Sequence, residues 1–268
     1  MKIGELIFIG MGLDSEEGMS LKALNTLKRA DLIFLETYTA SADPDVSLKV
    51  ERLTEKRVIM ADRATIEDGS KILKAASEND MVALLVVGDA MSATTHIDLR
   101  LRAVDANLTT SVIEGSSIFT AAPGLCGLSH YKFGRTTTLA FPQDNYFPES
   151  PYDMIEMNMK NGLHSLVLLE FTIEENRIMT ANDGMKILLK LEGRKKRDIL
   201  NETTLICVIA RAGSDDAVAR AGSIGDLIRE DFGDPMHSLI IPGKLHFKEA
   251  EALVKLCGAS EGLMDTVD

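Results

Sequence analysis

Residues 82–96 read VALLVVGDAMSATTH, an apolar run that ends abruptly at Gly88 and Asp89 and continues in small polar residues. A valine-rich run of this kind, bounded by glycine, is typical of a strand buried in a parallel sheet. Ligands bind at the C-terminal ends of strands in open α/β sheets, and small residues there let a ligand approach the backbone. We therefore expect a binding site directly after this strand.

Strand-like and helix-like segments alternate around this stretch. The predicted strands of the first half lie at residues 6–10, 32–36, 57–60, 81–87 and 111–114. Apolar residues repeat at helical spacing at residues 21–30 and 97–107, and Ser20 is a plausible N-cap of the first of these helices. This β-α-β rhythm predicts an α/β fold, with a parallel sheet and helices on both of its faces.

The second half of the chain has shorter and more mixed segments. Its predicted strands lie at residues 136–141, 165–171, 205–210, 217–221 and 238–241, and its predicted helices at residues 152–161, 181–191 and 247–256. This pattern predicts a second α/β domain that contains antiparallel pairing. We expect an N-terminal domain of residues 1–108 with a mainly parallel sheet, and a C-terminal domain of residues 109–268 with a mixed sheet.

Composition narrows the class of protein. The 268 residues carry a formal net charge of −12 at pH 7 and are 45% hydrophobic, which suits two medium-sized soluble domains. No Lys/Arg block marks a nucleic-acid surface. No apolar run approaches the roughly 20 residues of a membrane span, and Glu5 interrupts the N-terminal run as in a strand, not a signal peptide. We expect a cytoplasmic protein that binds neither nucleic acid nor membrane.

The cysteines and histidines show no metal-ligand spacing. The three cysteines, Cys126, Cys207 and Cys257, are far apart in the sequence, and we expect them to be reduced thiols in the core. The chain contains no CxxC or HExxH pairing, so we expect no metal site.

The first predicted strand ends in a second glycine-rich segment. Gly10 and Gly12 follow that strand, and Glu36 ends the next one, as in enzymes that bind a nicotinamide dinucleotide. Against this alternative, residues 14–18 (DSEEG) separate the glycines from the next helix, whose N-terminus a pyrophosphate requires. A plain strand-to-helix turn is the other interpretation. Residues 114–118 (EGSSI) repeat the pattern of a strand that ends in small polar residues.

Long segments of the chain match a known family. They are IFIGMGL (7–13), VGDAMSATTHIDLRLRA (87–103), GSSIFTAAPGLCGLSHYKFGRTTT (115–138), NYFPESPYD (145–153), MTAN (179–182), ARAGS (210–214) and IREDFGDPMHSLIIPGKLHFKEAE (228–251). In these segments the chain resembles the diphthine synthases, a family within the tetrapyrrole methylase superfamily. The matches are collinear and extend over nearly the whole chain.

The resemblance implies a fold and a reaction. It implies two α/β domains with S-adenosyl-L-methionine in the cleft between them, usually in a homodimer. It implies methyl transfer to the amino group of a modified histidine on translation elongation factor 2, in diphthamide synthesis, with S-adenosyl-L-homocysteine as the product of the cofactor. The alternatives are a precorrin-type methylase of a small tetrapyrrole, the nicotinamide-binding oxidoreductase and a non-catalytic binding module. The block at residues 130–153 argues against the first, because it matches the protein-modifying branch.

The resemblance also implies a set of cofactor contacts. They are Leu13, Asp89, Ser92, Ser117, Ile118, Leu169, Ala212 and His237. Related proteins commonly have a proline where this chain has Ala90, so we expect a somewhat looser turn there. No catalytic base can be named from the sequence. Candidates for contacts with the acceptor are Tyr131, Lys132, Arg135, Asn145 and Tyr146.

Overall fold

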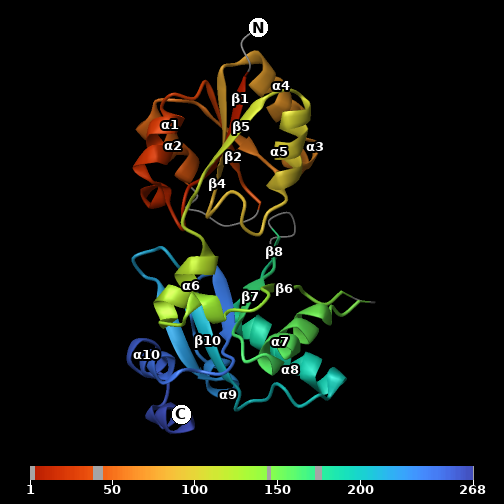
Figure 1. Ribbon diagram of the computed structural model, residues 1–268, viewed down its shortest axis with the longest axis vertical. Helices are drawn as coiled ribbons and strands as arrows, with labels where there is room; N and C mark the ends of the chain where they lie inside the picture. Colours follow the sequence, from red (N-terminus) through yellow and green to blue (C-terminus); the bar gives the residue numbers. More distant parts are fainter. Residues whose placement is uncertain (1–3, 39–44, 144–145, 173–176, 268) are drawn as a thin grey trace. The chain divides into compact units, whose positions relative to one another are not determined.

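The computed structural model describes residues 4–38, 45–143, 146–172 and 177–267 (Figure 1). It divides the chain into two compact units, Met1–Ile118 and Phe119–Asp268. Each unit is built on its own five-stranded sheet. The α/β class expected from the sequence is confirmed.

The sheet of the first unit is entirely parallel over its described pairs. Its strands run in the order β3-β2-β4-β1-β5. Their bounds are β1 Glu5–Gly10, β2 Leu32–Glu36, β3 Val58–Ala61, β4 Met81–Val86 and β5 Thr109–Ile113. The valine-rich apolar run before Gly88 therefore forms β4, which lies between β2 and β1 in the interior of the sheet.

Alternation along the strands builds two separate cores. Leu6 and Phe8 of β1 pack on one face of the sheet, and Ile7 and Ile9 pack on the other. The first face is covered by α3 (Arg63–Asp68), α4 (Ser70–Glu78) and α5 (His96–Asp105), and the second by α1 (Leu21–Leu27) and α2 (Val46–Thr54) (Figure 1). Helices on both faces were expected, and Ser20 caps α1 by accepting a hydrogen bond from the N–H of Ala23 (3.1 Å).

The boundary between the units differs from the expected one between residues 108 and 109. The structure divides the chain after Ile118, because β5 pairs in parallel with β1 and so belongs to the first sheet. A strand at the edge of a parallel sheet has no sequence mark that assigns it to that sheet, since the assignment depends on its partner.

The second unit has a mixed sheet in the order β11-β10-β12-β7-β6. Its strands are β6 Thr137–Leu139, β7 Ser165–Leu169, β10 Leu205–Ala210, β11 Val218–Ser223 and β12 His237–Ile241. The pairs are antiparallel except β6 with β7, which confirms the predicted mixture. A separate two-stranded ladder joins β8 (Phe171–Thr172) and β9 (Arg177–Ile178).

Helices also complete the second unit. The apolar sides of α7 (Ser150–Lys160), α8 (Ala181–Lys195) and α9 (Ile224–Leu227) share one core with the sheet. The remaining helices are α6 (Ile118–Cys126) and α10 (Phe247–Cys257), and short 3₁₀ turns lie at η1 Glu16–Gly18, η2 His130–Lys132 and η3 Glu261–Thr266. The three cysteines lie on α6, β10 and α10, and they are buried free thiols, as expected.

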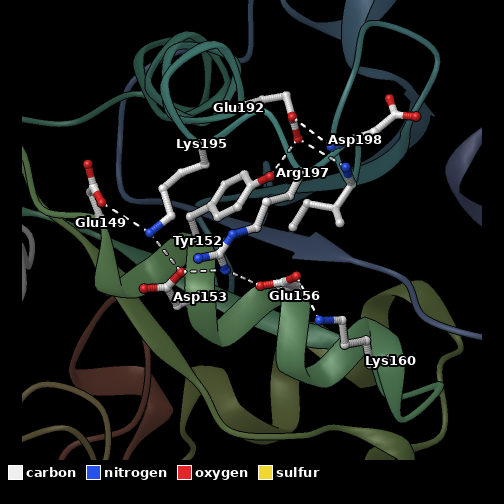
Figure 2. Close-up of polar contacts among 10 residues, drawn as sticks. Glu149, Tyr152, Asp153, Glu156, Lys160, Glu192, Lys195, Arg197 and Asp198 are labelled. Atoms are coloured by element: carbon white, nitrogen blue, oxygen red, sulfur yellow. Dashed lines mark hydrogen bonds and ion pairs between the residues drawn. The ribbon is translucent and has the colours of Figure 1, made fainter.

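A polar network joins α7 to the end of α8 (Figure 2). Tyr152 is fully buried, and its hydroxyl donates to Glu192 Oε2 (2.7 Å). The Glu192 carboxylate also accepts the backbone N–H groups of three consecutive residues beyond the end of the helix, Asp198, Ile199 and Leu200. Lys195 bridges Glu149 and Asp153 (3.0 Å each), and Arg197 pairs with Asp153 and Glu156.

These contacts set the acidity of Glu192. Burial alone would raise its pKa, but the hydrogen bonds from Tyr152 and from the three backbone N–H groups outweigh burial and lower the pKa to about 2. The ionised carboxylate is thus the form that holds the loop after α8.

We expect Glu192→Gln to lower Tm at neutral pH by roughly 3–10 °C, because a charge-assisted hydrogen bond contributes about 1.5–3 kcal/mol. A depressed pKa stabilises the fold above the ordinary value of 4.5, and this contribution is lost as pH falls toward about 2. The Tm difference between wild type and variant should therefore shrink over that range in thermal melts. The exposed Glu202 provides the control Glu202→Gln, and an equal, pH-independent loss in both variants would contradict the assignment.

Candidate functional site

Three loops of the first unit lie at one edge of its sheet. β4 and β5 flank β1, and all three strands run in the same direction, so the loops that follow them are neighbours. These are the glycine-rich segment after β1, the Gly88-Asp89 corner after β4 and the Gly115 corner after β5. The structure thus brings together the small-residue corners that the sequence placed at the ends of separate strands.

Glycines let the three backbones touch. A Cβ on Gly10 would lie 2.5 Å from the backbone N of Gly115, and a Cβ on Gly115 would lie 2.3 Å from the carbonyl oxygen of Gly88. No side chain fits at either position. Gly88 differs, because a Cβ there would meet only the Ser116 carbonyl oxygen, at 4.0 Å, and its φ of +79° favours glycine. The backbone at Gly88 therefore borders open space.

The Asp89 carboxylate ties two of these loops together. Oδ1 accepts the N–H of Met91 (3.0 Å) and the hydroxyl of Ser92 (2.9 Å), and Oδ2 accepts the N–H of Gly115 (3.2 Å). These bonds occupy three of about four acceptor positions of a carboxylate. Asp89 is a turn residue and also a link between the loops after β4 and β5, so its removal would disturb both loops.

The turn at Ala90 is held by hydrogen bonds. Its carbonyl oxygen accepts the hydroxyl of Thr94 (3.0 Å) and lies 2.8 Å from Nδ1 of His96. Because a carbonyl oxygen only accepts hydrogen bonds, His96 carries its proton on Nδ1. The His96 side chain is fully buried. These two hydrogen bonds restrain the turn at Ala90.

The remaining predicted residues of the first unit lie on the same loops. Leu13 follows Gly12, whose backbone pairs with Gly88 in both directions (3.0 and 2.7 Å). Ser117 and Ile118 follow the Gly115 corner and lead into α6. All three side chains are partly exposed.

In the second unit, the predicted residues Leu169, Ala212 and His237 lie at one edge of the sheet. β7 ends at Leu169 and β10 ends just before Ala212, whereas the antiparallel strand β12, between them, begins at His237. Ala210 pairs directly with His237. The structure therefore groups the three residues that the resemblance assigned to the second domain.

Both ring nitrogens of His237 are occupied. Nδ1 accepts the N–H of Ala181 (3.0 Å), so the proton resides on Nε2, which donates to the carbonyl of Asp234 (3.1 Å). The ring is buried, and burial lowers the pKa of His237, so the imidazole is neutral near pH 7. His237 has no free nitrogen with which to act as a base. The MTAN, ARAG and DPMH segments meet at this point.

The loop after β1 does not suit a dinucleotide. The N–H of Gly12 is bound to Gly88, and the 3₁₀ turn η1 separates the glycines from α1, which starts only at Leu21. Glu36 is 3% exposed, and its Oε1 accepts the N–H of Tyr38. The donors and the carboxylate that a dinucleotide would need are thus used within the protein.

The candidate acceptor residues are dispersed. Tyr131 and Tyr146 are 86% and 63% exposed, and Arg135 is exposed. Lys132 instead pairs with the buried Glu249, which also accepts from His164 Nε2 (3.3 Å), and it serves to anchor the turn at η2. Asn145 lies outside the described residues.

Among the described residues, no group of three or more His, Cys, Asp or Glu side chains is arranged to hold a metal ion. In the same part of the chain, every helix is too short or too polar to cross a membrane.

Comparisons with known proteins match the whole chain. The model of the tetrapyrrole (corrin/porphyrin) methylases matches residues 5–228. A protein of Methanocaldococcus jannaschii named diphthine synthase is 46% identical over 255 residues, which cover 94% of this chain and 98% of the relative. The diphthine synthase of Methanothermobacter thermautotrophicus is 44% identical over 260 residues, covering 97% and 98%.

A solved structure agrees. A crystal structure of diphthine synthase superposes with a TM-score of 0.88 at 30% identity, and the match covers 98% of this chain and 100% of that one. Fold, length and sequence thus correspond from end to end. The chain belongs to the tetrapyrrole methylase family and, within it, to the diphthine synthases.

Proposed function

We propose that this chain is an S-adenosyl-L-methionine-dependent N-methyltransferase that methylates the amino group of the modified histidine of translation elongation factor 2, in diphthamide synthesis. The observation that carries the proposal is the similarity to diphthine synthases over nearly the full length of both chains. A shared fold alone supports little about function, but an identity of 46% over 94% of the chain supports a shared reaction.

The first unit fits a small ligand of this kind. The open space beside the backbone of Gly88 would admit a ligand to main-chain groups. Asp89 retains one acceptor position, which suits a donor or the positive charge of a sulfonium compound. We propose Leu13, Asp89, Ser92, Ser117 and Ile118 as cofactor contacts in this unit, and Leu169, Ala212 and His237 in the other.

For methyl transfer from a sulfonium, the protein mainly has to bind the two reactants and align them. When bound, the cofactor supplies a methyl group on a sulfonium, which departs readily. The chain's own loops would hold the reactants in line and keep water away, effects worth up to about 7–11 kcal/mol for well-oriented reactants. The fully occupied ring of His237 is consistent with a role in binding and excludes this side chain as the base that frees the acceptor amine.

The alternatives are less well supported. A precorrin-type methylase would share the fold, but the curated relatives that match over the whole chain are named diphthine synthase. A nicotinamide-binding oxidoreductase would need the N–H of Gly12 and the carboxylate of Glu36, both of which are engaged. We further propose that the protein works in the cytoplasm as a homodimer.

We expect the purified protein, supplied with S-adenosyl-L-methionine, to add methyl groups to the modified histidine of elongation factor 2, as read by mass spectrometry. S-adenosyl-L-homocysteine should raise Tm, since a ligand that binds only the folded protein stabilises it, whereas NAD should not. Absence of methylation with a Tm rise in NAD alone would favour the oxidoreductase. Absence of methylation despite binding of S-adenosyl-L-homocysteine would favour a binding module.

We expect Asp89→Ala to weaken S-adenosyl-L-homocysteine binding roughly 10- to 150-fold, the equivalent of one charge-assisted hydrogen bond, and to lower Tm. The Tm loss follows because Met91, Ser92 and Gly115 lose their acceptor. Asp98→Ala, on the exposed side of α5, is the matched control, since it removes a carboxylate whose ion pair among the described residues is with Arg102 (3.6 Å). Unchanged affinity in a destabilised Asp89→Ala protein, measured by calorimetry, would limit Asp89 to a structural role.

We expect light scattering at micromolar concentration to give twice the 29.2 kDa mass of one chain. The expectation rests on the family resemblance. A measured mass of 29.2 kDa would contradict it.

A further inference from the structure

We infer that Arg211 is a positioning residue for cofactor binding, because its guanidinium holds the two loops that carry Ala212 and His237. The inference rests on the proposed function, which makes Ala212 and His237 cofactor contacts. Arg211 itself is the residue between the end of β10 and Ala212.

The guanidinium spans both loops. On one side, Nη1 donates to the carbonyls of Phe232 (2.5 Å) and Asp234 (2.9 Å), in the loop that leads into β12. On the other side, Nε donates to Asp216 Oδ2 (2.6 Å) and Nη2 donates to the Asp216 carbonyl (3.1 Å), in the loop that follows β10. The Arg211 side chain is 19% exposed, whereas its partner Asp216 is 68% exposed, so the bond to Phe232 is the more shielded part of the arrangement and the pair with Asp216 faces water.

The backbone of Arg211 also forms hydrogen bonds with both loops. Its N–H donates to the carbonyl of Met236 (2.9 Å), and its carbonyl accepts the hydroxyl of Ser214 (2.8 Å). Its φ of +48° is in the left-handed region, which is uncommon for an arginine. Opposite it, a Cβ on Gly233 would lie 2.8 Å from Nη1, so the loop approaches the guanidinium closely only because residue 233 is glycine.

A shared acceptor connects Arg211 to His237. The carbonyl of Asp234 accepts from Arg211 Nη1 and from His237 Nε2, and His237 Nδ1 accepts the N–H of Ala181 at the start of α8. Arg211 and His237 thus fix the loop of residues 231–236 from two sides. Without the guanidinium, the carbonyl of Phe232 and the carboxylate of Asp216 would each lose this donor.

The geometry requires arginine rather than a positive charge alone. Acceptors lie on both sides of a planar fork with five N–H donors, whereas a lysine ammonium presents its donors from one point. The hydrogen bonds from Ser214 and from Arg211 also lower the pKa of Asp216, which stays ionised as the partner of the guanidinium.

The test uses the full-length protein with Arg211→Ala, Arg211→Lys and the control Arg220→Ala. Arg220, on β11, also pairs with a carboxylate, that of Glu230 (3.4 Å), at the beginning of the loop before β12, so Arg220→Ala removes an ion pair of that loop while the bonds of Arg211 to Phe232, Asp234 and Asp216 stay in place. We expect Arg211→Ala to raise the Kd for S-adenosyl-L-homocysteine about 10- to 100-fold, as for a displaced binding group. Arg211→Lys should recover little of this affinity, and Arg220→Ala should bind like wild type.

Two readouts separate positioning from general destabilisation. In the ligand-free protein, amide hydrogen exchange should accelerate in residues 212–217 and 231–237 of Arg211→Ala and not in the strands. In turnover, KM for S-adenosyl-L-methionine should rise while KM for elongation factor 2 stays unchanged. If Arg211→Ala does not fold, Asp216→Ala, which removes one exposed acceptor, should still raise the Kd by about threefold, in line with loss of a modest hydrogen bond.

The outcomes distinguish this inference from the proposed function. Wild-type affinity in Arg211→Ala and Asp216→Ala, or full recovery in Arg211→Lys, would overturn the positioning role and leave the proposed function intact. Failure of the wild-type protein to bind S-adenosyl-L-homocysteine would overturn the proposed function and this inference with it.

Discussion

The first unit depends on a contact between main chains. Gly10, Gly88 and Gly115 end or follow neighbouring strands, and their backbones approach so closely that a Cβ at Gly10 or Gly115 would overlap another backbone atom. The Asp89 carboxylate spans the same junction by accepting the N–H of Gly115. The absence of side chains at Gly10 and Gly115 therefore lets the loops approach, and the Asp89 carboxylate links them. The proposed cofactor contacts of this unit lie on these loops.

In the second unit, the loops that carry the proposed cofactor contacts are joined mainly by side chains. Its sheet is mixed, so the edge with Leu169, Ala212 and His237 is formed by two strand ends and one strand start. A guanidinium and a neutral imidazole join the loops there, sharing the carbonyl of Asp234. These side chains add to a direct backbone contact between the loops, in which the N–H of Arg211 donates to the carbonyl of Met236 (2.9 Å).

Two carboxylates, the partly buried Glu192 and the buried Glu249, stabilise the parts of the second unit away from this edge. Glu192 accepts hydrogen bonds from the Tyr152 hydroxyl and from three backbone N–H groups. Glu249 accepts hydrogen bonds from Lys132, from His164 and from two backbone N–H groups. In both cases burial would raise the carboxyl pKa, and the hydrogen bonds overcome it and lower the pKa to about 2. A carboxylate that accepts several N–H groups fixes a loop firmly, because each group would otherwise be left without a partner.

The sequence by itself determined the class of fold, the positions of the main strands along the chain, one helix cap and the family. These features follow from local patterns: the apolar run of β4, the alternation in β1, and the position of Ser20, which caps α1. Long collinear motifs carried the family resemblance. The helices α2, α3 and α4 were not predicted, because they have 9, 6 and 9 residues, fewer than the roughly 11 over which helical periodicity becomes recognisable.

Only the tertiary structure decided which residues share a contact. It assigned β5 to the first sheet, and so moved the boundary to Ile118, because the partner of an edge strand is not written in its own residues. It showed that Asp89 links two loops and that both ring nitrogens of His237 form hydrogen bonds. It also showed that the Arg211 guanidinium donates hydrogen bonds to two loops. Each of these depends on groups many residues apart in the chain, whose distances follow from strand order and packing rather than from any local pattern.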